Sequence, residues 1–424
     1  MKISELIAPA GSLESLETAL LYGADAIYAG VPNFGLRAKS LLTPEELIYG
    51  SEIIHKQNKK LYLTLNSFFK NSDFDNLDKL CNIIKAINAD ALIISDLAVF
   101  TEMKKNFPNI EFHVSTQANI CSYKAVNSWA NLGADLCVLA RELSFTEIKE
   151  IREKCPNIKL ETFIHGAMCM SYSGRCLLSN FLTGRAANKG DCAHSCRWKY
   201  KVYLEEEKRP NEFFELIEDD KGSYILNSKD LCLMSKINKL LEIGIDSLKI
   251  EGRNKTQYYA AIVVRAYKQA MKDYYKNSEN FNYKLYTEEL LTVANRGYTE
   301  GFFEGNLSEK AHNYETTASN SKFEWAAYIE DLKEDYFVLR IKNKIQIGDV
   351  FEFISPIWGQ DKKVKINNLI DNKTSLKKDV VHGSENTEIR FYFKDFLEQN
   401  NNLTLEELKK NFPKYTVIRK EKSF

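Results

Sequence analysis

The stretch SLESLETALLYGADAIYA, residues 12–29, sets the pattern that decides the fold. It begins with helix-like periodicity, and Gly23 is suited to close that helix in the left-handed conformation. A short β-rich run then follows at residues 26–29. Similar junctions occur at Asn88, Gly133 and Gly244, each between a helical segment and a strand-like run. The sequence therefore predicts a repeated unit of one strand and one helix.

Eight strand-like runs alternate with helical segments, and the four junctions precede the second, fourth, sixth and eighth of them. Two of the helices open with capping boxes that begin at Thr43 and Ser144. Eight such units with a two-unit rhythm predict a (β/α)8 barrel of the α/β class, with an open doubly wound sheet as the alternative. The strands are expected at residues 5–8, 26–29, 61–65, 91–95, 111–115, 136–140, 160–164 and 247–250.

A long excursion separates the seventh and eighth strands. We predict a catalytic barrel over residues 1–310 with a cysteine-rich insertion at 166–246. An insertion after the C-terminal end of a barrel strand lies on the catalytic face. From about Lys322 the sequence changes to alternating strand-like runs, so residues 322–424 are predicted to form a separate small all-β barrel domain.

The bulk composition excludes several classes of protein. Lys plus Arg and Asp plus Glu both number 58, so no overall charge attracts nucleic acid or membrane, and any polyanion site must be a local patch. The N-terminus lacks the basic start and long apolar run of a signal peptide, and no segment is apolar enough to span a membrane. We therefore expect a cytoplasmic protein without a membrane partner. Nine cysteines, an odd number, also argue against a disulfide framework.

The stretch ETFIHGAMCMSYSGRCLLSNFLTGRAANKGDCAHSCRW, residues 161–198, concentrates the cysteines. It holds Cys169, Cys176, Cys192 and Cys196, and Cys232 follows further on. Zinc sites usually have two closely spaced cysteine pairs, and this pattern has one. Iron–sulfur clusters tolerate irregular spacing because loops deliver the thiolates from several directions. An iron–sulfur cluster is the first interpretation, zinc the second and unliganded thiols the third.

Basic and aromatic residues are interleaved with these cysteines. Basic groups neutralise phosphates and aromatic rings stack on unpaired bases, which favours RNA contact. The alternative is that the cations balance the thiolate charge and the rings, which include Phe181, pack internally. The candidate RNA-binding residues are Arg175, Arg185, Lys189, Arg197, Trp198 and Lys199.

Polar residues at the strand ends complete the predicted barrel mouth, and the last strand directs Lys249 toward it. Arginine forks match carboxylates, so Arg37, Arg141 and Arg253 are candidates to clamp a carboxylate-bearing small molecule. Ion pairs with Glu142 and Glu251 are the alternative role of these arginines. His165 close to Cys169 also allows a Cys–His nucleophile, although one nucleophile does not explain four neighbouring cysteines. The candidate catalytic residues are Arg141, Arg253, Glu251, His165 and Gln117.

These residues resemble the signature of the collagenase-like "U" peptidase family, the group of unknown catalytic type. The resemblance runs from ELIAPAGS and GADAIYAG through VSTQANI, NKGDCAHSCRW and NSKDLC to DSLKIEGR, and it covers nearly the whole chain. Lys189 replaces the usual arginine and keeps the charge. By length and appended β domain, the chain is most similar to the branch that forms 5-hydroxyuridine at the tRNA wobble position.

The resemblance implies an RNA-modifying enzyme that depends on prephenate as cosubstrate and acts on tRNA. Relatives in other branches hydroxylate a cytidine of ribosomal RNA or act in ubiquinone synthesis with a four-cysteine [4Fe-4S] cluster. Carried over to this chain, the cluster ligands are Cys169, Cys176, Cys192 and Cys232, with Cys196 as a substitute for Cys192. The resemblance leaves open a shorter paralogous subunit as partner.

Two other functions compete with this interpretation. The family name implies a collagenase-like peptidase, which predicts gelatin cleavage that needs no iron. A non-catalytic RNA-binding or assembly subunit with a structural metal predicts tRNA binding without turnover. The sequence does not specify the oligomeric state.

Overall fold

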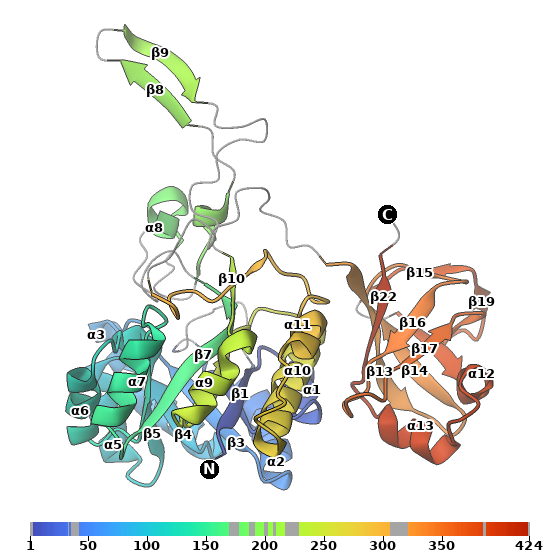
Figure 1. Cartoon of the computed structure of the whole chain (residues 1–424), viewed down its shortest axis with the longest axis horizontal. Coiled ribbons are helices and arrows are strands. Elements are labelled where there is room, and N and C mark those ends of the chain that lie inside the picture. Colours follow the sequence, from blue (N-terminus) through green and yellow to red (C-terminus); the bar gives the residue numbers. More distant parts are fainter. Residues whose placement is uncertain are drawn as a thin grey trace. The chain divides into compact units, whose positions relative to one another are not determined.

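The computed structural model describes residues 3–32, 34, 42–168, 178–185, 191–198, 202–206, 209–216, 229–305, 321–384 and 387–422. Eight parallel strands close into a barrel, because the eighth strand pairs with both the first and the seventh (Figure 1). The predicted (β/α)8 barrel is confirmed, and the open sheet is excluded. Its strands are β1 (Glu5–Pro9), β2 (Ala26–Gly30), β3 (Lys60–Leu65), β4 (Ala91–Ile94), β5 (Glu111–Val114), β6 (Leu136–Val138), β7 (Lys159–Ala167) and β11 (Ser247–Ile250).

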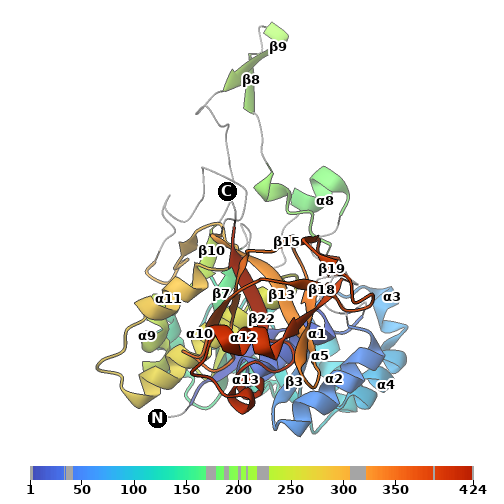
Figure 2. The same ribbon diagram turned by 90° about the vertical axis from the view of Figure 1, so that its right-hand side faces the viewer.

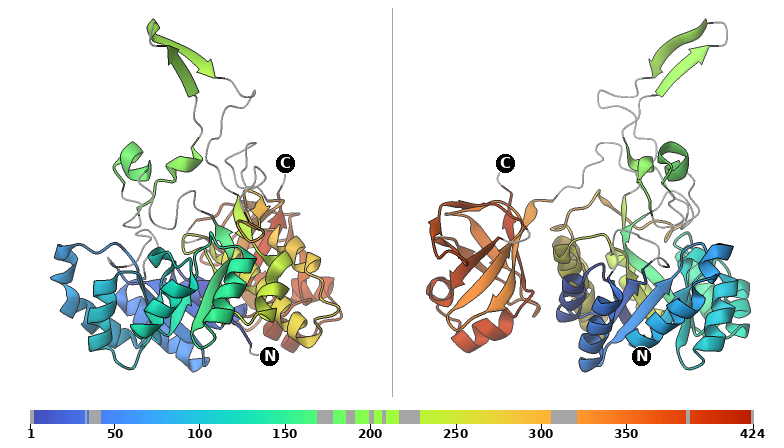
Figure 3. Two further views of the ribbon diagram at one scale, coloured as in Figure 1. Left: turned by 60° about the vertical axis from the view of Figure 1, so that its left-hand side comes forward. Right: turned by 180° about the vertical axis from the view of Figure 1, so that it is seen from behind.

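Helices connect successive strands, and Figure 3 shows those of blue to green colour around the strands. Both predicted capping boxes are present, since the side chains of Thr43 and Ser144 each accept a hydrogen bond from the backbone of the glutamate three residues on. No helix among the described residues has the length and apolar character needed to cross a membrane. The connecting helices are α1 (Leu13–Leu21), α2 (Pro44–Lys56), α3 (Asn71–Phe74), α4 (Leu77–Ile87), α5 (Leu97–Asn106), α6 (Tyr123–Asn131), α7 (Phe145–Lys154) and α9 (Ile237–Glu242), and α10 (Gln257–Lys276) follows the last barrel strand.

The four predicted junctions all adopt the left-handed conformation. Their φ angles are 107° at Gly23, 57° at Asn88, 91° at Gly133 and 73° at Gly244. Glycine and asparagine reach this region at low cost, which explains why these residue types end the helices.

An aspartate stands two residues after each of these helix-ending residues. In three of the four junctions its carboxylate accepts a hydrogen bond from the backbone N–H of the second residue of the preceding barrel strand. The bond therefore joins one strand to the start of the next and fixes their register. The pairs are Asp90 with Leu61 (2.8 Å), Asp135 with Phe112 (2.8 Å) and Asp246 with Leu160 (2.9 Å).

The insertion after the seventh strand is also confirmed. The chain leaves β7 and returns through β10 (Asp230–Cys232), which runs antiparallel to the end of β7 and pairs Cys232 with His165. A short strand, β12 (Tyr298–Thr299), continues the sheet beside β10. The described parts of the excursion are α8 (Leu178–Thr183), the 3-10 turn η3 (Ser195–Arg197) and the hairpin of β8 (Val202–Glu206) and β9 (Arg209–Leu216).

The chain divides into two compact units. The first holds the barrel strands and the excursion, and the second joins α1, α10 and α11 (Lys284–Leu290) to the C-terminal region. The second unit contains an eight-stranded antiparallel sheet in the order β17-β16-β22-β13-β14-β21-β18-β19 and the separate pair β15–β20 (Figure 2). The strands are β13 (Phe323–Leu332), β14 (Tyr336–Ile341), β15 (Ile345–Gln346), β16 (Val350–Phe353), β17 (Lys362–Lys365), β18 (Leu369–Asp371), β19 (Lys377–Lys378), β20 (Val380–Val381), β21 (Glu388–Tyr392) and β22 (Val417–Glu421).

The predicted C-terminal β domain is thus confirmed, with two short helices that the sequence analysis did not predict. These are α12 (Phe393–Gln399) and α13 (Leu405–Asn411). α12 places Phe393 and Phe396 in the core of the sheet, and Phe412 joins them directly after α13. The rings of Phe353 and Phe396 are 5.0 Å apart, and those of Phe396 and Phe412 are 5.3 Å apart. The aromatic core holds the helices against the sheet.

Candidate functional site

Two predicted arginines lie at the C-terminal ends of barrel strands. Arg253 follows β11, is buried, and donates a hydrogen bond from Nη1 to the hydroxyl of Thr64 on β3 (3.0 Å). Arg141 follows β6 and donates from Nη1 to the carbonyl oxygen of Ala167 at the end of β7 (2.8 Å). Both guanidinium groups are therefore held at the end of the barrel where active sites of this fold are built.

The predicted residues His165 and Glu251 lie on neighbouring strand ends. The backbone N–H of Glu251 donates to the carbonyl oxygen of His165 (2.8 Å). The adjacent Gly166 has a φ of 119°, and a Cβ there would lie 2.6 Å from the backbone oxygen of Glu251. Only glycine lets the two strands approach this closely. The side chain of His165 is buried, with its ring 5.2 Å from that of Tyr298.

Tyr298 connects this corner of the barrel with Cys232. Burial raises the pKa of Tyr298 well above its usual value, and the nearby Cys232 and Asp230 raise the pKa further when they carry negative charge. Asp230 is itself neutralised by a buried ion pair with Arg296. The thiol of Cys232 thus lies in a buried polar corner together with a phenol and an ion pair.

Two buried acceptor atoms at the mouth have no hydrogen-bond partner among the described residues. They are Oε1 of Gln117, just after β5, and Oε2 of Glu142, just after β6. An unsatisfied buried acceptor costs about 1–3 kcal/mol, so such atoms are typical of places where a ligand supplies the donor. Asn66, after β3, donates from Nδ2 to the hydroxyl of Ser115, after β5 (3.1 Å), which joins two further strand ends.

The sequence analysis missed an ion pair inside the barrel. Lys249 was expected to point to the mouth, but its side chain is buried and donates from Nζ to Oε1 of Glu161 on β7 (2.7 Å). The hydroxyl of Ser247 donates to the other oxygen of Glu161 (2.8 Å). The ammonium group also lies 4.4 Å from the ring centroid of Tyr28, and the Arg253 guanidinium lies 5.7 Å from the same ring. The signal in the sequence was a charged residue within each of two largely buried strands, Glu161 in β7 and Lys249 in β11.

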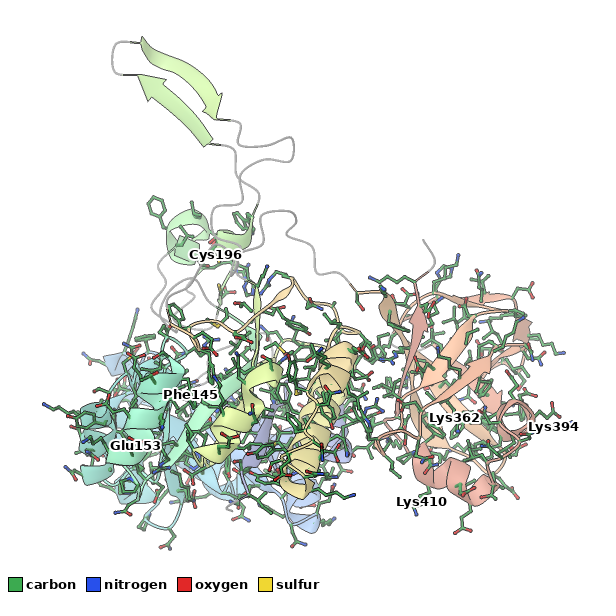
Figure 4. All side chains as sticks on the ribbon, viewed as in Figure 1. Phe145, Glu153, Cys196, Lys362, Lys394 and Lys410 are labelled. Carbon is green, nitrogen blue, oxygen red and sulfur yellow. The ribbon has the colours of Figure 1, made fainter. Side chains whose placement is uncertain are left out.

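The described part of the cysteine-rich excursion forms a small cross-linked segment, with Cys196 beside α8 (Figure 4). The guanidinium of Arg185 donates from Nε and Nη2 to Asp191 (2.9 and 2.6 Å). The backbone N–H of His194 donates to the sulfur of Cys192 (3.4 Å). Trp198, at the end of η3, is 45% exposed. The predicted RNA-binding residues Arg185 and Trp198 therefore lie in one ordered segment.

The remaining predicted ligands and contacts cannot all be placed. Cys192, Cys196 and Cys232 carry thiol groups, which are the donors that an iron–sulfur cluster requires. Within the described ranges, no three histidine, cysteine, aspartate or glutamate side chains are arranged to hold a metal ion. Cys169, Cys176, Arg175, Lys189, Lys199 and Arg37 lie outside the described residues, as does the side chain of Arg197.

The fold and the position of the cysteines define a class of protein. It is a (β/α)8 barrel whose seventh strand leads into a cysteine-rich excursion, with a further cysteine on the strand by which the chain returns. Residues 11–313 match the peptidase family U32. The match spans well over half of the chain, and the chain belongs to this family.

Curated relatives carry two kinds of name. The chain is 38% identical over 375 residues to the tRNA hydroxylation protein P1 of Bacillus subtilis, which covers 85% of this chain and 88% of that protein. It is 34% identical over 392 residues to the tRNA hydroxylation protein P of Escherichia coli, covering 83% and 86%. It is also 33% identical over 372 residues to a collagenase of Porphyromonas gingivalis, covering 84% and 87%.

Proposed function

We propose that this protein is an RNA-modifying enzyme that hydroxylates the wobble uridine of tRNA to 5-hydroxyuridine. The observation that carries the proposal is the sequence similarity to two tRNA hydroxylation proteins, which are 38% and 34% identical to this chain over more than four fifths of each sequence. The product carries a hydroxyl group in place of the hydrogen on C5 of the uracil ring, so the reaction is a two-electron oxidation that needs an oxygen donor and an electron acceptor in addition to the residues of this chain.

The barrel mouth supplies binding groups that suit this reaction. The buried guanidinium of Arg253 and the partly buried one of Arg141 match the carboxylates of prephenate, the proposed cosubstrate. The orphan acceptors of Gln117 and Glu142 suit N–H or O–H donors on a bound ligand. In this proposal the two arginines orient prephenate, and the acceptor atoms of Gln117 and Glu142 bind the wobble uridine beside it.

The cofactor is proposed to be a [4Fe-4S] cluster held by Cys169, Cys176, Cys192 and Cys232, which would supply electron transfer. The thiol groups of Cys192 and Cys232 suit this role, and Cys196 is the substitute for Cys192. Within the corner described above, the buried His165 and the neighbouring Tyr298 shape the surroundings of Cys232. Iron, sulfide and visible absorption measured together after anaerobic purification distinguish this cluster from zinc.

Mass spectrometry of tRNA tests the proposal directly. A strain that lacks this protein is expected to lose 5-hydroxyuridine and its derivatives, and the wild-type protein to restore them. An Arg253→Ala variant is expected to restore little, because it removes the buried cation. Unchanged 5-hydroxyuridine in a deletion strain with no redundant pathway would falsify the proposal. Binding of tRNA without turnover, given iron and prephenate, would instead favour a non-catalytic subunit.

A peptidase function is the second candidate, because one relative of similar coverage is named a collagenase. It predicts that the purified protein cleaves gelatin without added iron. A Cys169→Ala variant would lose that cleavage. Cleavage that persists in the variant, or that copurifies with a contaminant, argues against this function.

A further inference from the structure

The cysteine-rich excursion exposes apolar side chains on an ordered segment. Phe181 on α8 is 84% exposed, its neighbour Leu182 is 42% exposed, and Trp198 at the end of η3 is 45% exposed. Several exposed large apolar side chains within one short segment are typical of a binding surface, whereas single ones are common on any protein.

Hydrogen bonds hold these side chains in fixed places. The hydroxyl of Ser179, a buried residue of α8, donates to the carbonyl oxygen of Arg185 (3.0 Å) and accepts from the backbone N–H of Ala193 (2.9 Å). Arg185 in turn donates to Asp191 and to the carbonyl oxygen of Cys192. The segment that carries Phe181 is therefore tied to the segment that carries Trp198, and neither ring is on an untethered loop.

The charge of the sequence on either side of the rings favours one kind of partner. Between Met168 and Lys201 the chain has six basic residues and a single acidic one, Asp191, whereas the whole chain has no net charge. A protein or membrane partner with apolar anchors does not require such a local excess. A positively charged segment with protruding rings is typical of surfaces that bind single-stranded nucleic acid, where bases stack on the rings and cations follow the phosphates.

We propose that Phe181 and Trp198 stack on unpaired bases of the tRNA anticodon loop. This inference rests on the proposed function. It assigns an RNA contact to Phe181, which is uncharged and is not one of the proposed cluster ligands. It separates two terms of RNA binding: the cations provide the salt-dependent part, and the two rings provide a part that does not depend on salt.

The test is the affinity of the anaerobically purified holoprotein for an unmodified anticodon stem-loop, measured at several salt concentrations. Phe181→Ala is expected to weaken binding about 10-fold, in the range that stacking on one base provides, with the salt slope unchanged. Phe181→Tyr keeps the ring and is expected to bind like the wild type. Lys199→Gln, at the residue that follows Trp198 in the sequence, is expected to reduce the salt slope by about one.

Tyr49→Ala is the matched control, since Tyr49 is a 53% exposed aromatic residue on α2 and is expected to leave binding unchanged. The inference is overturned if Phe181→Ala binds as tightly as Tyr49→Ala. It is also overturned if Phe181→Ala loses visible absorption or melting temperature together with affinity, because the ring then holds the excursion together. If wild-type protein binds RNA through Phe181 but forms no 5-hydroxyuridine, the proposed function fails and the stacking contact stands.

Discussion

The two units of the molecule bury charge in different ways. In the second unit, Arg265 and Arg419 share Glu289, and each has a further carboxylate of its own, Asp361 for Arg265 and Glu352 for Arg419. Inside the barrel, Lys249 pairs with one carboxylate among the described residues, that of Glu161, and its ammonium group lies 4.4 and 5.7 Å from the rings of Tyr28 and Phe163.

The difference separates a structural role from a binding role. The arginine network joins α10 and α11 to the sheet through several forked contacts, which suits a permanent connection. The barrel pair is one-to-one and lies beneath Tyr28 and Arg253, close to the strand ends where a ligand would bind. A buried ion pair alone does not indicate function, but its neighbours distinguish the two cases.

The largest effect is expected in the arginine network. Arg265→Met leaves the carboxylate of Asp361 without its cation and leaves Glu289 with Arg419 alone, so we expect the free energy of unfolding to fall by about 3–5 kcal/mol in urea. Lys394→Ala is the control, because Lys394 pairs with Glu398 on the exposed surface and should change stability by less than about 0.5 kcal/mol. A loss below about 1 kcal/mol for Arg265→Met would show that the network is not structurally important.

A smaller effect is expected for the barrel pair. Glu161→Gln keeps the shape but leaves the charge of Lys249 unpaired, and we expect a loss of about 3 kcal/mol in the free energy of unfolding. The double variant Glu161→Leu with Lys249→Met should regain stability, because an apolar pair can replace a buried ion pair. It should not regain 5-hydroxyuridine formation, since the cation below the mouth is gone. Full activity in the double variant would reduce the pair to a structural role and remove the contrast with the network.

The smallest effect concerns a half-exposed carboxylate at the start of β5. Hydrogen bonds from His113 and Lys159 lower the pKa of Glu111 from 4.5 to about 2. Its contribution to stability is therefore complete above about pH 4.5 and is lost as the pH falls toward 2. Solvent screening limits this contribution to about 1 kcal/mol. Between pH 5 and 3, the free energy of unfolding should fall less steeply with decreasing pH in Glu111→Gln than in the wild type. Equal slopes would contradict the prediction.

The fold was largely predictable because its signals are local. The helix-ending residues at Gly23, Asn88, Gly133 and Gly244 and the capping boxes at Thr43 and Ser144 act within a few residues of the chain. Hydrophobic periodicity located each barrel strand to within a few residues. The helices α12 and α13 were not predicted, because each is only seven residues long and the alternating run EIRFYF of β21 extends into the first residue of α12.

The site was predictable only in part. The positions of Arg141, Arg253 and Gln117 follow from the rule that polar residues after parallel strands meet at one end of a barrel. The Glu161–Lys249 pair was not predictable, because strand register decides which inward side chains meet, and register is not written in either strand alone. The ligand set of the cysteines stays a prediction, because Cys169 and Cys176 lie outside the described residues.

The return of the excursion through β10 has a consequence for how this protein can vary. Because β10 is hydrogen-bonded along β7, the two ends of the excursion are fastened side by side whatever lies between them. Doubling the length of a flexible closed loop costs only about 0.6 kcal/mol. The excursion can therefore be lengthened, shortened or exchanged between homologues without disturbing the eight barrel strands. Substrate preference can evolve in the excursion while the barrel stays constant.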